Sequence, residues 1–495
     1  MGITRFCAIL GALLLCAPAD GIAGAAGPLQ SSGVSGNMVL VVFNSDPGLV
    51  LAPAVDLSNG MHRIASSFGS VNALFERYDA AFSRQMFAGT RLQWVYEFAV
   101  KGGAEAAVAA FRRDPHVAYA RPSEPDMEAR IKATIDGINA QTRGAWTAGV
   151  TVPGIMTPAD QKKLLGGLPE SWAPRGENVS PSAPKSCTLK GHLLHCASIP
   201  LPQSFDWRSF NGKNYVTPVK DQQSCGSCWA FAAVADVEIE ANAYYNQLLG
   251  LDLSEQQILS CSPSSGDCVE GYTGLALNYA QSTGLVSAAC FPYRNSDQTP
   301  CSQMCANPTY WKVGTWSWIQ WTPDGIVSPL DEQLGLLEYG PFAMWMMEYS
   351  DFWYYTGGVY YPTPNANQIG GHLTAAVGYG YAPPPGAAAG SDATALYLAS
   401  KNSWGTTWGE KGFFRIYYGV SQDNVWIGPV VAPAPPAPVE AACEDLDHAG
   451  HCYWGLGSRP ANCPASCTTP IEYCRYGGDT ALPAPCITRY PEGRP

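Results

Sequence analysis

The pattern of apolar and polar residues predicts a small α+β unit in the first quarter of the chain. Segments 38–43 (MVLVVF) and 91–100 (RLQWVYEFAV) are rich in β-branched and aromatic residues, which favour strands. Apolar residues at helical spacing predict helices over 71–82 and 104–113, and segment 114–122 contains a short strand. We interpret the order as strand, helix, strand, strand, helix, strand, which is typical of an α+β plait.

The same pattern predicts a long helix and two strands in the second half of the chain. Apolar residues recur at helical spacing over 229–249, so Cys228 falls in the first turn of a helix. His372 stands at the head of an apolar strand, and Asn402 follows a second strand. The Pro-, Ala- and Gly-rich segment 382–395 between these strands predicts a long hairpin loop.

The start of the chain has the pattern of a secretory signal peptide. It has one basic residue, an apolar run over 6–17, and small residues at Ala19, Ala23 and Ala26. A membrane span needs about 20 apolar residues, and no segment of the chain supplies such a run. We therefore expect residues 1–26 to be a signal peptide, no membrane span, and a secreted, lysosomal or vacuolar location.

Changes in composition divide the rest of the chain. A polar, Pro-containing stretch carries the only glycosylation sequon, at Asn178, which we expect to be exposed and glycosylated. The predicted units are an α+β domain over 27–126, a second segment over 127–200, a larger domain over 201–431, a Pro/Ala linker over 432–442, and a module with six cysteines over 443–495.

Composition and charge narrow the class of protein. The chain has 495 residues, of which 46% are hydrophobic and 14% charged, so it can bury several cores and is not globally disordered. Residues 201–432 carry 8 basic and 19 acidic side chains. Nucleic acid is therefore excluded as an expected partner.

The 17 cysteines follow the pattern of a disulfide-bonded secreted protein. Seven of them lie between Cys225 and Cys305, so six can pair and one thiol is left free. The six in 443–495 predict a three-disulfide miniature domain. Its aromatic residues could bind a glycan or a protein, or could simply pack around the disulfides. We do not expect a metal site at its two histidines.

Cys225-Gly226-Ser227-Cys228 has four possible interpretations. A zinc site lacks a second ligand pair within 201–432, and a thioredoxin-like redox pair would have its Trp before the first Cys. A disulfide and a nucleophile remain. A nucleophilic thiol needs a helix N-terminus and an imidazole, and His372 is the only histidine in 201–432. Asn402 could orient that imidazole, or it could be a turn residue.

Six motifs in this part of the chain together resemble the papain family of cysteine proteases. They are LPQSFDWR, PVKDQQSCGSCWAFA, LSEQQILSC, GPFAMWM, HLTAAVGYG and KNSWGTTWGEKGFFRI, in the family's order. His372 and Asn402 follow Cys228 by 144 and 174 residues, and the loop 382–395 accounts for most of the longer spacing. The resemblance implies an α+β fold with a helical lobe and a β-barrel-like lobe.

The resemblance also implies roles for individual residues. Cys228 would be the nucleophile, His372 the general base and acid, and Asn402 the group that orients the imidazole. Gln222 matches the family's oxyanion-hole glutamine. The residues implied in substrate binding are Gly226, Gly271, Tyr272 and Trp404, of which Gly271 would present backbone groups to an extended peptide and Trp404 would shield the His–Asn contact.

Family pairing further implies disulfides Cys225–Cys268 and Cys261–Cys301. Cys290 and Cys305 are then left to pair with each other, and Cys228 alone is free. The sequence departs from the family pattern at three places: Gln223 stands for a usual Gly, Val269-Glu270 for Asn-Gly, and Gly371 for Asn or Asp.

The region before the larger domain has two further resemblances. Residues 27–126 resemble the propeptide-inhibitor domain of subtilisin-like proteases, although an unrelated α+β binding domain fits too. Segment 138–170 resembles the propeptide of cathepsin B-like enzymes, in which a helix ends at Leu-Leu-Gly and the chain crosses the active-site cleft in reverse direction.

We therefore expect a cysteine endopeptidase made as an inactive precursor. It would act on polypeptides as a monomer, be inhibited by its own propeptide, and use no cofactor and no metal. A catalytically silent homologue that acts as a binding or inhibitory protein is the alternative, and a disulfide oxidoreductase is a second class.

Overall fold

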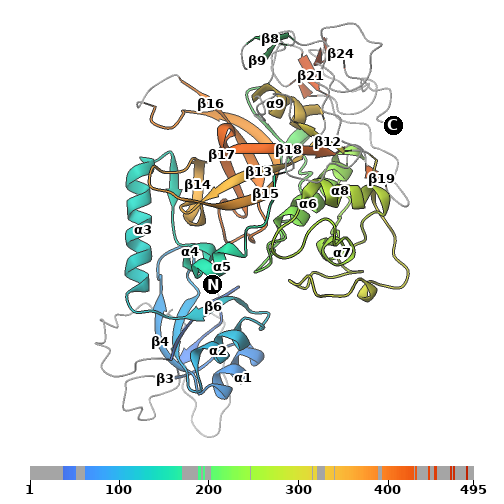
Figure 1. Ribbon diagram of the computed structural model, residues 1–495. Coiled ribbons are helices and arrows are strands. Elements are labelled where there is room, and N and C mark those ends of the chain that lie inside the picture. Colours follow the sequence, from blue (N-terminus) through green and yellow to red (C-terminus); the bar gives the residue numbers. More distant parts are fainter. Residues whose placement is uncertain are drawn as a thin grey trace, which may run out of the picture.

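The computed structural model describes most of the chain between residues 37 and 431 (Figure 1). The described ranges are 37–51, 62–169, 188–190, 193–195, 202–245, 247–314, 316–319, 329–338, 340–387, 393–427 and 430–431, with short strands at 444–445, 451–453, 469–470, 472–473 and 487–488. The predicted signal peptide, the Asn178 sequon, the Pro/Ala linker and the core of the six-cysteine module lie outside them.

The first unit is a six-stranded sheet covered by two helices, which we call the plait. Its elements are β1 (Met38–Phe43), β2 (Val50–Leu51), β3 (His62–Ala65), α1 (Gly69–Arg77), β4 (Ala81–Met86), β5 (Val95–Ala99), α2 (Ala104–Phe111) and β6 (Val117–Pro122). The strand order is β2-β3-β4-β5-β1-β6, and every pairing is antiparallel.

Three details of the plait differ from the prediction. The helix over 71–82 ends at Arg77, because Asp79 has a φ of 43° that a right-handed helix cannot contain, and residues 81–82 lie in β4. The strand over 91–100 begins only at Val95. Residues 91–94 lead into it from a turn in which the Thr90 hydroxyl donates to the Phe87 carbonyl. Strands β2 and β3 were not predicted.

Strand β1 is buried on both faces, which explains its unbroken apolar sequence. Val39, Val41 and Phe43 pack under helices α1 and α2, in a core that contains Phe75. The alternate residues of β1 face the other way and join a second core, which runs on through the rest of the molecule. The plait is therefore packed between its own helices and the elements that follow it.

The chain between the plait and the large domain contains one long helix and several short elements. Helix α3 (Met127–Thr142) was not predicted, although Met127, Ile131, Ile135 and Ile138 recur at helical spacing and are all buried. After it come β7 (Trp146–Ala148), α4 (Val152–Ile155) and α5 (Pro158–Lys162). We call residues 146–169 the connecting segment. Figure 1 shows α4 and α5 between the plait and the large domain.

A nine-stranded sheet forms one lobe of the large domain, which we call the sheet lobe. Its strands are β10 (Phe205–Asp206), β12 (Trp316–Ile319), β13 (Phe342–Tyr349), β14 (Tyr355–Tyr360), β15 (Gln368–Ala382), β16 (Ala395–Lys401), β17 (Phe413–Tyr417), β18 (Ser421–Ile427) and, from the connecting segment, β7. The order is β12-β18-β13-β15-β16-β17-β14-β7, with β10 on β15. The predicted hairpin loop joins β15 to β16.

Helices form the other lobe, beside the sheet (Figure 1). They are α6 (Cys228–Tyr244), α7 (Glu255–Cys261) and α8 (Thr273–Ser282), and α9 (Pro329–Glu338) lies nearer the sheet. Helix α6 packs on β15 and is buried around nearly its whole circumference.

The remaining short elements are η2 (Phe210–Gly212), η3 (Cys301–Gln303), η4 (Phe352–Tyr354), η5 (Tyr418–Val420), β8 (Thr188–Lys190), β9 (Leu193–His195), β11 (Lys312–Val313), β19 (Val430–Val431), β20 (Glu444–Asp445), β21 (His451–Tyr453), β22 (Thr469–Pro470), β23 (Glu472–Tyr473) and β24 (Ile487–Thr488).

Gln223, one departure from the family pattern, lies in the loop before α6 with a left-handed backbone. Its φ is 55°, a conformation that costs a residue with a side chain roughly 1–2 kcal/mol. Its N–H donates to the Asp221 carboxylate at 2.8 Å, which holds the turn closed. A glycine would adopt the same conformation without the steric cost.

Replacing Gln223 by glycine should therefore raise the free energy of unfolding by about 0.5–1 kcal/mol, as measured by chemical denaturation of the full chain. Gln281→Gly in helix α8 is the matched control, and it should lower the free energy of unfolding by about 1 kcal/mol. A loss of stability in Gln223→Gly would show that the glutamine side chain, and not the backbone conformation, matters at this position.

Candidate active site

Cys228 is the first residue of α6 and the only free cysteine in the described part of residues 202–431. Its side chain is completely buried. Burial raises the pKa of the Cys228 thiol to about 12, although backbone N–H groups of Leu373, Trp229 and Gly167 oppose that rise. The thiol therefore lies where a helix N-terminus could stabilise a thiolate, but in this form of the protein it is protonated at neutral pH.

His372 lies near the start of β15 and contacts Asn402, which follows β16. The His372 Nε2–H donates to Asn402 Oδ1 at 2.8 Å, and this oxygen also accepts the Ser403 N–H. The Trp404 ring covers the pair, with its centroid 4.7 Å from that of the imidazole. Burial lowers the pKa of His372 to about 4, while the bond to Asn402 partly opposes the shift.

The predicted nucleophile and base share no hydrogen bond in this form of the protein. Within the described ranges, His372 Nδ1 has no hydrogen-bond partner. Because Nε2 carries the proton that Asn402 accepts, Nδ1 is left as the basic atom. Cys228 and His372 are thus both uncharged at neutral pH, with the imidazole already in the tautomer that could accept a proton.

Gln222 holds a carbonyl of the connecting segment. Its side-chain amide donates to the Leu164 carbonyl at 3.1 Å and to the Cys225 carbonyl at 2.9 Å. The Ser403 hydroxyl donates to Gln222 Oε1 at 2.6 Å and fixes the orientation of the amide. The group predicted to stabilise an oxyanion is therefore turned toward a carbonyl oxygen, and that oxygen belongs to the chain itself.

Sequence reasoning missed Ser403 and Tyr293, which both support Gln222. The Tyr293 hydroxyl donates to the Gln222 backbone carbonyl at 2.9 Å and lies 2.8 Å from the Ser227 hydroxyl. Ser403 could have been found, because it follows Asn402 in the same motif. Tyr293 lies in a loop with no periodic pattern, so nothing in the sequence indicates this contact.

The connecting segment continues from Leu164 between the two lobes. Gly271 N–H donates to the Gly166 carbonyl at 2.8 Å, and Leu168 N–H donates to the Gly271 carbonyl at 3.0 Å. Gly167 forms a parallel bridge with Gly271, and its carbonyl accepts the Trp345 indole N–H at 2.9 Å. The backbone groups of Gly271 predicted to bind an extended peptide are thus occupied by the connecting segment.

The backbones approach so closely here that side chains would not fit. A Cβ on Gly226 would lie 2.3 Å from the Leu165 carbonyl, and one on Gly371 would lie 2.1 Å from the Gly167 carbonyl. The second contact gives a physical reason for Gly371, where the family often has Asn or Asp. Tyr272, the remaining predicted binding residue, caps α8 beside Gly271, and its N–H donates to the Ser265 carbonyl.

The resemblance implied a helix that ends at Leu-Leu-Gly, and α5 (Pro158–Lys162) lies directly before that sequence. The Leu164 and Leu165 N–H groups donate to the Gln161 and Lys162 carbonyls, so turns continue from α5 to Gly166. Upstream, β7 adds to the edge of β14, and the buried Trp146 donates its indole N–H to the Tyr361 carbonyl.

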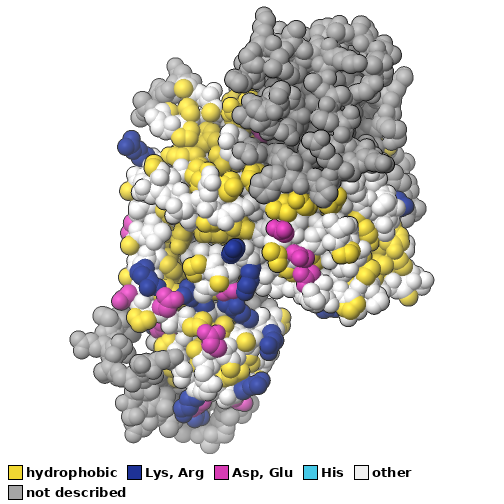
Figure 2. Space-filling view, in the orientation of Figure 1, with side chains coloured by type: hydrophobic (Ala, Val, Ile, Leu, Met, Phe, Trp, Pro, Cys, Tyr) yellow, Lys and Arg dark blue, Asp and Glu magenta, His cyan; other side chains and the backbone are white. Residues whose placement is uncertain are grey.

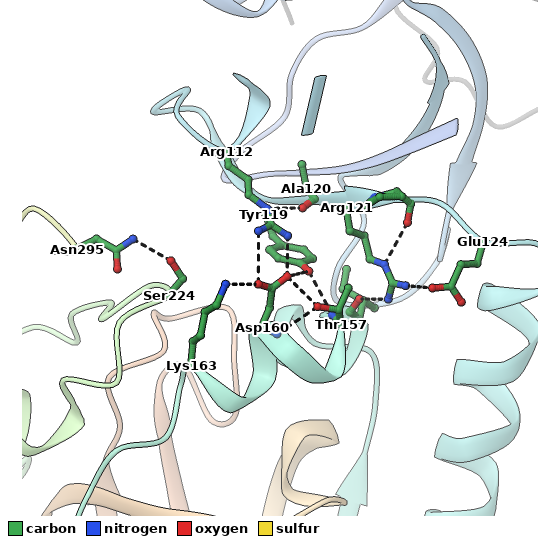
Figure 3. Close-up of polar contacts among 12 residues, drawn as sticks. Arg112, Tyr119, Ala120, Arg121, Glu124, Thr157, Asp160, Lys163, Ser224 and Asn295 are labelled. Atoms are coloured by element: carbon green, nitrogen blue, oxygen red, sulfur yellow. Dashed lines mark hydrogen bonds and ion pairs between the residues drawn. The ribbon is translucent and has the colours of Figure 1, made fainter. Parts of the chain in front are cut away.

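The plait holds the connecting segment through the buried carboxylate of Asp160 (Figure 3). This carboxylate accepts hydrogen bonds from Arg112 and Tyr119 of the plait, each at 2.7 Å, and from Thr157 and Lys163 at 2.9 Å. Burial alone would raise the pKa of Asp160, but these four donors hold it far below its usual range. We call these five residues the Asp160 cluster.

A second contact joins the plait to the same segment, and a third joins it to the sheet lobe. Arg121, ion-paired with Glu124, donates to the Ile155 carbonyl at 3.1 Å (Figure 3). Arg91 donates to the carbonyls of Thr356 and Gly409 in the sheet lobe, at 3.0 and 2.8 Å. Figure 2 shows basic side chains gathered over the plait and its junction with the large domain.

Comparison with known proteins identifies the family. Residues 201–430 match the family model described as papain family cysteine protease. Mexicain from Jacaratia mexicana is 32% identical over 219 residues, which cover 43% of this chain and 88% of that protein. The chain belongs to the papain family of cysteine proteases. Cathepsin C from Schistosoma mansoni is 32% identical over 239 residues, and the match spans 46% of this chain but only 50% of that relative.

A solved structure titled proCathepsin B S9 from Trypanosoma congolense also aligns with this papain-family chain. The identity is 21% and the TM-score 0.48, over 60% of this chain and 98% of the other.

The papain-family domain has three disulfides, of which the first two are the pairs that the resemblance implied and the third joins the two cysteines left over. They are Cys225–Cys268, Cys261–Cys301 and Cys290–Cys305. Cys225 therefore belongs to the disulfide framework and is separated in role from Cys228.

In the described part of the chain, no helix is long and apolar enough to cross a membrane, and no cluster of three His, Cys, Asp or Glu side chains could hold a metal ion.

Breaking the Asp160 cluster should loosen the connecting segment. We expect Arg112→Ala to speed trypsin cleavage at Lys162 and Lys163 about tenfold, because a hydrogen bond to a charged group contributes about 1.5 kcal/mol at the lower end of its range. The measurement is limited proteolysis of the full chain in a Cys228→Ser background, which removes any self-cleavage.

Arg113→Ala is the matched control, since Arg113 is the exposed neighbour of Arg112 and is not part of the Asp160 cluster. It should leave the cleavage rate unchanged. Equal rates in the two variants would show that the Asp160 cluster does not hold the connecting segment in place.

Proposed function

We propose that this chain is the inactive precursor of a cysteine endopeptidase that hydrolyses peptide bonds with Cys228, His372 and Asn402. The observation that carries the proposal is the Leu164 carbonyl held by Gln222 beside the buried Cys228. A carbonyl oxygen at that place is where the oxyanion of an attacked peptide would form. In the precursor, the connecting segment fills this place without being cleaved.

Catalysis requires the connecting segment to leave. Water then reaches Cys228 and His372, so the burial that suppresses their charged forms is lost and the thiol can transfer its proton to His372 Nδ1. The Cys228 thiolate attacks the carbonyl carbon of the bound peptide. The oxyanion accepts hydrogen bonds from the Gln222 amide and the Cys228 backbone N–H.

Collapse of this tetrahedral intermediate breaks the peptide bond. The imidazolium of His372 gives its proton to the leaving amine, which departs and leaves a thioester on Cys228. Water then attacks the thioester carbonyl while His372 accepts a proton from it, and the Cys228 sulfur leaves as the second product is released. Asn402 keeps the ring orientation and the tautomer constant through both steps.

The substrate would bind as an extended strand on Gly271, in place of residues 166–168. The bridge of Gly167 to Gly271 is parallel, so this part of the connecting segment runs in the same direction as the chain at Gly271. A substrate that pairs antiparallel with Gly271 would run in the opposite direction. That difference would explain why the connecting segment resists cleavage. The rest of the region 27–200 would then act as an intramolecular inhibitor.

The complete set of Gln222, Cys228, His372 and Asn402 favours an enzyme over a catalytically silent homologue. The disulfide at Cys225 argues against an oxidoreductase, because it removes the partner that a redox Cys-x-x-Cys pair needs.

We further propose secretion, or delivery to a lysosome or vacuole, on the basis of the apolar start of the sequence. We also propose that the protein acts as a monomer. We retain the glycosylation of Asn178 and a glycan or protein ligand for the six-cysteine module as proposals.

Cys228→Ser should abolish peptide hydrolysis by the processed enzyme, and Gln222→Ala should lower turnover by on the order of 10²-fold, because an oxyanion donor is lost. Steady-state kinetics with a fluorogenic peptide measures both. Gln223→Ala changes the exposed neighbouring amide and should keep the parental turnover. Full activity in Cys228→Ser would refute the proposed nucleophile, and an unchanged rate in Gln222→Ala would refute the oxyanion role.

A further inference from the structure

Glu348 is a fully buried carboxyl group that the proposed mechanism does not use. It lies near the end of β13 with no solvent exposure, and within the described part of the chain neither of its carboxyl oxygens has a hydrogen-bond partner. Burial raises the pKa of Glu348 well above its usual range, and the negative charge of Asp351 adds to the rise. An unpartnered acid in a protein interior lowers stability, so its presence here suggests a function.

The strand register places Glu348 beside the catalytic histidine. In the antiparallel pair of β13 and β15, Glu348 lies opposite Gly370, and Met346 lies opposite His372. Residues opposite each other, and residues two apart on one strand, share a face of the sheet. Glu348 is therefore on the face of His372, one residue pair along the ladder, and a negative charge on Glu348 would raise the pKa of the Cys228 thiol.

The connecting segment fills the space next to Glu348 with an apolar side chain. A Cβ on Gly370 would lie 2.9 Å from the Leu165 Cδ1 atom, so the Leu165 side chain occupies the place that a side chain at 370 would take. Because side chains opposite each other on a ladder are about 5 Å apart, Leu165 also borders Glu348. Removal of the connecting segment therefore opens a space at Glu348.

This space lies on the leaving-group side of the scissile bond. The acyl part of a substrate would pair with Gly271, where residues 166–168 of the connecting segment now lie. Leu165 precedes those residues. Its carbonyl lies at Gly226, whereas its side chain points to Gly370, away from Gly271. His372 gives its proton to the leaving amine, so a group beside His372 and away from Gly271 meets the residue that follows the cleaved bond.

The charges around this space favour a cation. Asp351 lies three residues from Glu348, and its carboxylate is held by the Tyr360 hydroxyl and by the N–H and hydroxyl of Thr363. These donors are all neutral, so they leave the negative charge of Asp351 uncompensated. Once water replaces Leu165, the desolvation that raises the pKa of Glu348 is reduced. The carboxylate form is then stabilised by positive charge, from the His372 imidazolium and from a basic side chain of the substrate.

We propose that Glu348 is a specificity-determining residue that binds a Lys or Arg side chain immediately after the scissile bond. This inference rests on the proposed peptidase function. Leu165 serves as the apolar occupant in the precursor, where burial disfavours the charged form of Glu348, and a basic side chain of the substrate takes its place in the processed enzyme.

The test uses quenched fluorescent peptides that are identical except for the residue after the cleaved bond, which is Lys, its neutral isostere norleucine, or Glu. We expect kcat/KM of the processed enzyme to be at least about tenfold higher for Lys than for Glu. In Glu348→Gln this ratio should fall to near one. A ratio within one variant is independent of how much of the enzyme is folded.

Asp236→Asn is the matched control, because Asp236 is also a fully buried carboxyl group whose pKa burial raises, but it lies on α6, well after Cys228. It should keep the parental ratio. Glu348→Leu, which fills the same space with an apolar side chain, provides a second variant and should favour norleucine over Lys.

The outcomes separate this inference from the proposed function. Cleavage of all three peptides at similar rates by the parent enzyme, or a Lys preference that persists in Glu348→Gln and Glu348→Leu, would overturn the role of Glu348 and leave the peptidase intact. No cleavage of any peptide by the processed parent would overturn the peptidase function, and the role of Glu348 with it.

Discussion

The close backbone contact of the connecting segment with both lobes is the constraint on which the rest of the structure depends. Gly166 and Gly167 pass between Gly226 on one side and Gly371 on the other, with no space for a Cβ on Gly166, Gly226 or Gly371. That approach puts the Leu164 carbonyl on Gln222 and excludes water from Cys228 and His372. The same backbone contact therefore both occupies the candidate active site and buries Cys228 and His372.

Burial has opposite consequences for the two kinds of ionisable group along this segment. Cys228 and His372 lose water without gaining a charged partner, so the pKa of the thiol rises and that of the imidazole falls, which leaves both neutral. Asp160 is buried among four donors, which together hold its pKa below the usual range and keep it charged. The same segment therefore suppresses the reactive groups at one end and is held to the plait by a charge at the other.

Much of the site could be predicted because each residue carries its own chemical signal. An odd number of cysteines indicated one free thiol, the domain has one histidine, and the resemblance to the papain family assigned these roles to Cys228 and His372 and added Asn402. The structure brings His372 and Asn402 into a hydrogen bond. The plait followed from strand and helix patterns, whereas the two-lobed fold of the large domain was implied by the resemblance. Helix α3 was missed although its spacing was visible, and α1 was predicted too long because Asp79 was not recognised as its end.

What could not be predicted depends on contacts between distant segments. Gly371 looked like an unexplained departure until the Gly167 carbonyl was found where its Cβ would lie. Glu348 looked like any polar residue at a strand end, because its burial is set by the register of β13 on β15 and by Leu165 from far upstream. Apolar spacing reports which face of an element is buried, and not which chain covers it.

The central claim is that the connecting segment holds the candidate active site closed and uncharged, and the pH dependence of Cys228 alkylation tests it most directly. Iodoacetamide labelling of the peptide that contains Cys228, followed by mass spectrometry, measures the rate in the intact precursor and after removal of residues 27–200. We expect almost no labelling of the precursor between pH 5 and about 9, because the thiol is buried and has a pKa of about 12. The processed protein should react on the order of 10²-fold faster at neutral pH. Equal rates in the two forms would contradict the account.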